Sequence, residues 1–142
     1  MKHRLKMKKL YFLFFGIIIL LYSCNEKSST KTGYNSVADM PARNNFSEKD
    51  LLYKGQSVKL TKHGSCRMDC RKLDAYEVQE VINVGRIIKR KSNHNSKPCP
   101  TIAYEGKTID GQWARVVVGA CEGDIKIVTV IDLYKEWDCN CR

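Results

Sequence analysis

Apolar residues recur at helical spacing in the middle of the chain. Asp74 has the chemistry of an N-cap, Glu77 follows three residues later as in a capping box, and Gly85 offers a stop. A shorter helix is predicted before it, starting after Thr61 and running to about Arg71. Three branched residues would form one apolar stripe on the later helix: Val78, Val81 and Ile82.

The pattern changes to that of β-strands from residue 86. Four stretches are predicted as strands: 86–91, 101–108, 113–120 and 126–132. Asp110-Gly111 is a strong hairpin signal between the second and the third. This order predicts an α+β fold in which two short N-terminal helices pack on a four-stranded antiparallel sheet. We expect a single disulfide-stapled domain over residues 51–142.

The N-terminus has the pattern of an export signal. Basic residues dominate positions 2–9, and residues 10–22 form an unbroken apolar run that is shorter than the roughly 20 residues of a spanning helix. Leu21-Tyr22-Ser23-Cys24 then resembles the lipobox of bacterial lipoproteins. We therefore expect a signal peptide over residues 1–23 and a lipid on Cys24, with an uncleaved N-terminal anchor as the alternative.

The residues after Cys24 lack a sustained apolar period, and we expect a flexible tether through residue 50. The formal net charge of the whole chain is +10. The predicted signal peptide holds five Lys or Arg and no acid, so its removal leaves a net charge of +5. Solubility explains this mild value better than nucleic-acid binding does. The expected location is the cell envelope, lipid-anchored to a bacterial membrane and facing the periplasm or the cell surface.

The remaining six cysteines indicate a disulfide framework, because an even number in a small exported domain is typical of one. If Ile109-Asp110-Gly111 forms a hairpin loop, Cys99 lies opposite Cys121 at the open end of the hairpin, and we expect these two to be joined. The six are Cys66, Cys70, Cys99, Cys121, Cys139 and Cys141.

The other four cysteines would fasten the C-terminal tail along the first helix. Cys66 and Cys70 share one helix face, and Cys139 and Cys141 point the same way if the tail is extended. Which sulfur meets which stays open. The same residues with His63 nearby suggest a zinc site as a competing interpretation, but their spacing is unlike zinc motifs, and we expect no metal.

The first helix also gathers candidate catalytic residues. On a helical wheel His63, Arg67 and Arg71 fall with Cys66 and Cys70 on one arc of about 140°. A histidine at the edge of the contact with the tail would suit a general base. The plainer interpretation is a structural histidine with arginines that serve as surface ion-pair partners.

These residues begin a longer pattern. Over roughly residues 57–133 the chain resembles the bacterial domains of unknown function numbered 4258. The residues that carry the resemblance are Leu60-Thr61-Lys62-His63, Arg67-Met68, Arg71, Glu77-Val78, Tyr104-Glu105-Gly106 and Val128-Thr129-Val130-Ile131.

Some of those domains are toxin-like modules, so the resemblance implies the fold of small metal-independent ribonucleases. In that fold His63 would take or give the proton of a ribose hydroxyl, and Arg67 and Arg71 would neutralise the phosphate. Thr129 or Lys107 would reach the same phosphate from the sheet. This remains an analogy at the level of the fold. The cysteines, the lipobox and the tether depart from the toxin pattern.

Two functions from different classes follow. The first is a non-catalytic module of the cell envelope that binds an unknown protein partner and needs no cofactor. The alternative is a metal-independent ribonuclease-like enzyme that cleaves RNA through His63 with Arg67.

Overall fold

The computed structural model describes residues 33–141. The predicted signal peptide, residues 1–23, and the predicted lipidation site, Cys24, lie outside the described residues. Within the described part of the chain, none of the helices combines the length and the apolar character needed to cross a bilayer.

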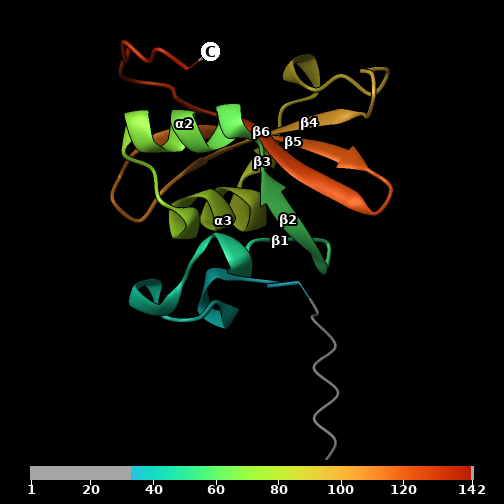
Figure 1. The fold of residues 1–142 in the computed structure, drawn as a ribbon. Coiled ribbons are helices and arrows are strands. Elements are labelled where there is room, and N and C mark those ends of the chain that lie inside the picture. Colours follow the sequence, from blue (N-terminus) through green and yellow to red (C-terminus); the bar gives the residue numbers. More distant parts are fainter. Residues whose placement is uncertain (1–32, 142) are drawn as a thin grey trace, which may run out of the picture. The chain divides into compact units, whose positions relative to one another are not determined.

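Short 3-10 turns precede and interrupt the regular elements (Figure 1). The 3-10 turns are η1 (Val37–Asp39), η2 (Arg43–Asn45), η3 (Glu48–Asp50) and η4 (Lys89–Lys91). The helices are α2 (Lys62–Arg71) and α3 (Ala75–Val84). The strands are β1 (Leu52–Tyr53), β2 (Gln56–Leu60), β3 (Arg86–Ile87), β4 (Thr101–Lys107), β5 (Trp113–Cys121) and β6 (Asp124–Asp132).

The strands form one mixed sheet of six strands, in the order β1-β2-β6-β5-β4-β3. Strand β2 runs parallel to β6, with Val58 opposite Ile125 and Leu60 opposite Ile127. All other neighbouring strands are antiparallel. The predicted four-stranded antiparallel sheet is therefore wrong, although the hairpin of β4 and β5 and the turn into β6 lie where the sequence indicates.

The sequence allows residues 57–60 as a short strand or a lead-in to the first helix, but it does not predict the parallel pairing of β2 with β6, because that pairing is long-range. Only Val58 of its five residues is buried, so the segment shows no clear alternation of apolar and polar positions. Strands β1 and β3 have two residues each, too few for a pattern. The predicted strand over residues 86–91 also ends early, because Lys89–Lys91 turn into the exposed η4.

Both helices begin at the predicted caps. The Thr61 hydroxyl accepts a hydrogen bond from the Gly64 amide at 2.9 Å and donates one to the Ile127 carbonyl at 3.0 Å. This one side chain therefore both starts α2 and ties it to β6. At α3, Asp74 and Glu77 exchange the two bonds of a capping box, at 2.9 and 3.0 Å.

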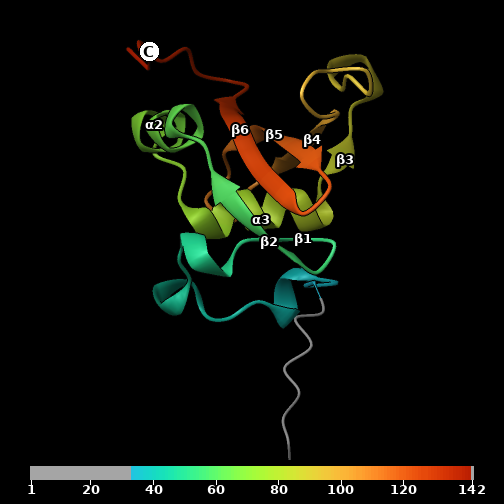
Figure 2. The same cartoon turned by 45° about the vertical axis from the view of Figure 1, so that its right-hand side comes forward.

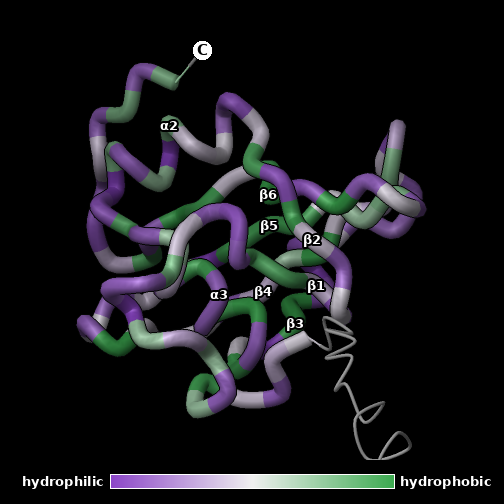
Figure 3. The backbone as a smooth tube through the Cα atoms, turned by 60° about the horizontal axis from the view of Figure 1, so that its bottom comes forward, coloured by the Kyte–Doolittle hydropathy of each residue, from purple (hydrophilic) through white to green (hydrophobic). Residues whose placement is uncertain are grey.

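The core lies between the helices and one face of the sheet. Helix α2 packs on β6, while α3 packs on β4 and β5 and lies below the strands in Figures 1 and 2. The backbone coloured by hydropathy shows hydrophobic stretches on the central strands (Figure 3). The fully buried members of the cluster are Leu51, Val78, Val81, Ala114, Val116, Val118, Ile127 and Val130.

Residues 33–50 are packed on this core rather than extended away from it. Met40 is buried, and the ring of Phe46 meets Tyr76 of α3 edge-on at 5.6 Å. Arg43 bonds to Asp74 at the start of α3. The part of the predicted tether that the structure describes therefore belongs to the folded unit.

Replacing Gly64 with alanine is expected to destabilise the protein. An added Cβ would lie 2.6 Å from the Ile127 carbonyl oxygen, a backbone atom that moves only if β6 moves. Overpacking of this kind costs about 1–3 kcal/mol, whereas the gain in helix propensity is at most about 1 kcal/mol. Urea unfolding should show a net loss for Gly64→Ala, and the matched Ser65→Ala variant should stay within about 0.5 kcal/mol of wild type. Equal stability of the two variants would contradict the close packing of α2 on β6.

Candidate functional site

Two disulfides fasten the C-terminal tail to α2. Cys66 is joined to Cys141 and Cys70 to Cys139, with Cα atoms 5.8 and 5.9 Å apart. The sequence left this pairing open. Either bridge alone closes a long loop, with sequence separations of 75 and 69, which stabilises a protein by about 4 kcal/mol in the chain-entropy model. Once one bridge is formed, the other closes only a short ring between α2 and the tail, so its contribution is smaller.

The third disulfide joins Cys99 to Cys121, with Cα atoms 4.9 Å apart. Strand β4 begins two residues after Cys99, and its first residue, Thr101, lies opposite Gly119 of β5. The bridge therefore closes the open end of this hairpin. It also fixes the base of the loop that precedes β4.

The tail covers one edge of the His63 ring. Nδ1 of His63 lies 3.2 Å from the Cys141 carbonyl oxygen, and Nε2 lies 3.3 Å from Nε of Arg67. An arginine Nε–H can only donate, so Nε2 accepts and Nδ1 carries the hydrogen that reaches the carbonyl. Both ring nitrogens are therefore occupied, although the side chain is exposed.

Arg71 is engaged by the sheet rather than free for a ligand. Its guanidinium donates to the Val130 carbonyl of β6, and its own carbonyl accepts from the Gln112 amide at 3.0 Å. The structure thus places His63 and Arg67 in contact on α2 and directs the next arginine onto the strand.

Thr129 lies apart from that group. It is opposite Val117 in the register of β5 and β6, next to Val130, whose side chain is in the core under the helices. Neighbouring strand residues point to opposite faces, so Thr129 faces away from α2. Lys107 is opposite Trp113, and the next residue of β5, Ala114, is buried in the core. By the same alternation, Lys107 faces away from the core. The structure does not bring either residue to His63.

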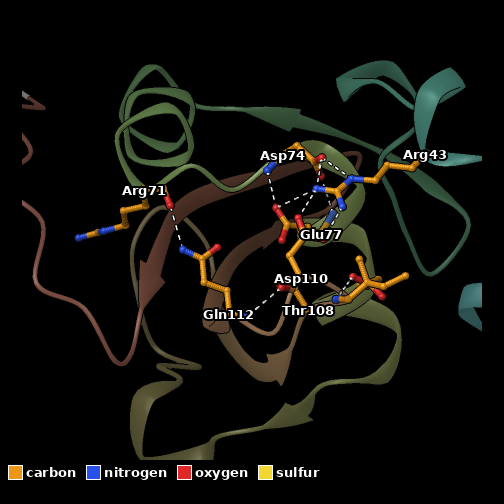
Figure 4. A network of polar contacts seen from close by, with 9 residues as sticks. Arg43, Arg71, Asp74, Glu77, Thr108, Asp110 and Gln112 are labelled. Carbon is orange, nitrogen blue, oxygen red and sulfur yellow. Dashed lines mark hydrogen bonds and ion pairs between the residues drawn. The ribbon is translucent and has the colours of Figure 1, made fainter.

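A second polar cluster surrounds Arg43 (Figure 4). Its guanidinium forms two parallel hydrogen bonds with the Asp110 carboxylate, both 2.8 Å, and one with Asp74 at 2.7 Å. A carboxylate oxygen of Glu77 lies 3.6 Å away. Arg43 therefore joins the N-terminal segment, the start of α3 and the β4–β5 hairpin. The sequence points to these acids as local caps and turns, and to Asp74 and Glu77 as ion-pair partners of the arginines of α2. In the structure both pair with Arg43 instead.

Glu77 is the most deeply buried acid in this cluster, with 1% of its side chain exposed. Burial raises the pKa of Glu77 above its ordinary value, while the Asp74 backbone amide, Thr108 and Arg43 partly oppose that shift. Its Oε1 atom is buried and makes no hydrogen bond of ordinary geometry with the described residues. A raised carboxyl pKa often marks functional sites. Here Arg43 and two carboxylates cover the group, so the structural role accounts for it.

A cavity of about 290 Å³ opens between residues 33–35, the β1–β2 turn, the end of α3 and β4. The Tyr104 hydroxyl donates to the Tyr53 hydroxyl at 3.2 Å in its wall, and burial raises the pKa of Tyr104. The Lys54 ammonium lies 5.3 Å from the centre of the Tyr53 ring. The lining residues are Gly33, Tyr34, Asn35, Leu52, Tyr53, Lys54, Gly55, Ile82, Asn83 and Tyr104.

Aromatic walls with hydroxyl, amide and ammonium groups suit a small polar ligand or a partner's side chain. The sequence does not indicate this cavity, because Tyr34 and Asn35 lie in a polar stretch that predicts a tether. Among residues 33–141 no group of three or more His, Cys, Asp or Glu side chains could hold a metal ion. The cysteines of the zinc interpretation are paired as disulfides instead.

The site and fold define an α+β module whose first helix is pinned between a mixed sheet and a stapled tail. A family model for a domain of unknown function, DUF4258, matches residues 60–132, which is more than half of the chain. The protein belongs to this family, and the resemblance seen in the sequence is confirmed. The match runs from the end of β2 to the end of β6, so Cys139 and Cys141 lie beyond it.

No curated protein and no solved structure matches the chain.

The raised pKa of Glu77 predicts a pH dependence of stability. Because the folded-state pKa lies above the unfolded one, the contribution is fully present below about pH 4 and is lost as the pH rises through the folded-state pKa. The unfolding free energy of wild type relative to Glu77→Gln should therefore fall between pH 4 and pH 8 in urea titrations.

Asp110→Asn provides a control of opposite sign. Hydrogen bonding to Arg43 lowers the pKa of Asp110, so its contribution is present above the unfolded pKa and is lost as the pH falls through the lower, folded-state value. If the difference in unfolding free energy between wild type and Glu77→Gln did not change with pH, the Glu77 carboxyl would not be held in a desolvated site.

Proposed function

We propose that this protein is an exported module that is anchored to a bacterial membrane by lipid on Cys24 and binds a protein partner without catalysing a reaction. The observation that carries the proposal is the occupied His63 ring. The candidate catalytic histidine makes two hydrogen bonds within the protein, one of them to the tail that two disulfides hold in place.

Export is supported by two independent features. The chain begins with a basic segment, a short apolar run and a lipobox-like sequence that ends at Cys24. The folded unit contains three disulfides, which form and persist in oxidising compartments. Lipid chains on Cys24 would hold the module stably at the bilayer.

The absence of catalysis is supported by how each candidate group is used. A general base needs a free lone pair within reach of the substrate, but Nε2 of His63 accepts from Arg67. Arg71 binds a backbone carbonyl of β6, and Thr129 lies on the opposite face of the sheet. The ribonuclease alternative needs these groups to converge on one phosphate.

Binding is supported by the cavity between residues 33–35, the β1–β2 turn, the end of α3 and β4. At about 290 Å³ it is near the lower limit for small-molecule sites, and it suits one or two side chains of a partner. Lys54 adds a positive charge at an exposed position, which favours an acidic or carbonyl-bearing group.

Photo-crosslinking in living cells tests anchoring and binding together. A photoreactive amino acid at Asn35, an exposed residue of the cavity lining, is expected to give one protein adduct of defined mass in the membrane fraction. The same group at Tyr134, which is 82% exposed and outside the lining, should give no such adduct. Cys24→Ala should abolish acylation and make the attachment sensitive to salt, so that a high-salt wash removes the protein from the membrane fraction.

Two results would contradict the proposal. One is acylation that survives Cys24→Ala, together with membrane attachment that a high-salt wash does not remove. The other is metal-free cleavage of RNA by oxidised residues 25–142 that is lost in His63→Ala, since that result would assign the α2 face to catalysis.

A further inference from the structure

One loop carries the positive charge of the described part of the chain. Residues 33–141 contain 17 Lys or Arg and 14 Asp or Glu, a net charge of +3. Residues 86–97 (RIIKRKSNHNSK) hold five of these basic residues and no acid, so the other described residues together have a net charge of −2. We call residues 86–97 the basic loop. Its cations are Arg86, Lys89, Arg90, Lys91 and Lys97.

These cations are free to meet a partner. All five side chains are exposed, and none forms an ion pair with another described residue. Four of the described cations outside the loop each bind a carboxylate within 4.0 Å: Arg43, Lys59, Arg115 and Lys126. The other cations outside the loop are spread along the sequence among acidic residues, whereas the loop gathers five unpaired cations without an acid.

The basic loop is held in one shape. The Ser92 hydroxyl donates to the Ile88 carbonyl and accepts from the Ala103 amide, both at 3.0 Å. Asn93 and Thr101 exchange two backbone hydrogen bonds of 2.8 Å. Just beyond the loop, Cys99 is joined to β5. Because the backbone of the loop is already ordered in the free protein, a partner that binds the loop loses little affinity to the entropy of ordering it.

Exposed aliphatic residues border the charges. Ile87 is 52% exposed on β3, one of the two edge strands of the sheet, and Val84 at the end of α3 is 58% exposed. The loop projects beyond the strands next to β4 in both cartoon views (Figures 1 and 2). Lysine and arginine beside exposed aliphatic side chains are typical of membrane-surface segments. Residues 84–97 contain no Phe, Tyr or Trp on which the bases of a nucleic acid would stack, and His94 is their one aromatic ring.

We infer that the basic loop is a second membrane contact, which binds the anionic headgroups of a phospholipid bilayer while Ile87 and Val84 enter the interface. This contact is separate from the lipid on Cys24 and does not depend on it. It would turn one face of the module toward an acidic membrane surface.

Cosedimentation with lipid vesicles tests this inference on oxidised residues 25–142, which keep every described contact of the fold and lack Cys24. Vesicles of phosphatidylcholine with about one third phosphatidylglycerol should bind the protein, and binding should weaken steeply with salt because surface charges are screened. Each basic residue at an anionic surface is worth a factor of about five. The triple variant Lys89→Gln, Arg90→Gln, Lys91→Gln should therefore bind about 100-fold more weakly.

A matched triple variant controls for the loss of net charge. Lys49→Gln, Lys62→Gln and Lys107→Gln remove the same charge from three exposed, unpaired lysines among the described residues outside the loop. This variant should retain most of the binding. Ile87→Ser should weaken vesicle binding several-fold without changing the melting temperature.

Three outcomes would overturn the inference. Equal losses in the two triple variants would show that net charge, not the loop, drives binding. Equal binding to vesicles of pure phosphatidylcholine would remove the role of anionic headgroups. Binding of a short RNA that matches vesicle binding in strength, and that Ile87→Ser does not affect, would assign the loop to polyanions rather than to a bilayer.

Discussion

Two disulfides, Cys66–Cys141 and Cys70–Cys139, hold the last residues of the chain along helix α2. The tail has no regular secondary structure, and it contributes no strand to the sheet. Its position therefore depends on these covalent links together with a few polar contacts near Asp132, such as the bond from the Trp137 indole. Where the tail lies decides what the exposed face of α2 can do.

The other side of helix α2 is fixed by very close packing on strand β6. Gly64 approaches the backbone of β6 at Ile127, and the Thr61 hydroxyl bonds to the same carbonyl. Helix α2 is thus held on one side by the sheet and on the other by the tail. A histidine on such a helix becomes part of the scaffold when a tail carbonyl reaches its ring. This arrangement is the reason why we propose a binding role for the chain rather than the catalytic role that the resemblance implies.

Much of the local structure was readable from the sequence. Thr61 and the pair Asp74 and Glu77 have the chemistry of helix caps, and the structure uses them as caps. Asp110 and Gly111 predicted the hairpin between β4 and β5, and this register explains why Cys99 and Cys121 were expected to meet. These features depend on residues close in sequence or on a single hairpin.

The errors involve contacts between distant segments. No local pattern shows that residues 56–60 pair in parallel with β6, because one buried residue leaves no period to detect. The contacts of Arg43 and the cavity do not follow from the sequence pattern, because residues 25–50 are polar and such a stretch predicts a tether. The sequence held a clue: Ser36 with Asp39, and Ser47 with Asp50, form capping boxes that mark ordered turns.

The hydrogen bonds of the His63 ring are the most direct test of this account. Long-range proton–nitrogen NMR spectra of oxidised residues 25–142 should show His63 with the hydrogen on Nδ1 and none on Nε2. His94, in an exposed polar loop, provides the reference within the same spectrum. The Cys139→Ser, Cys141→Ser variant should lose the Nδ1 preference of His63 and leave His94 unchanged. A His63 ring that carries its hydrogen on Nε2, or that matches His94 with both staples intact, would contradict the central claim.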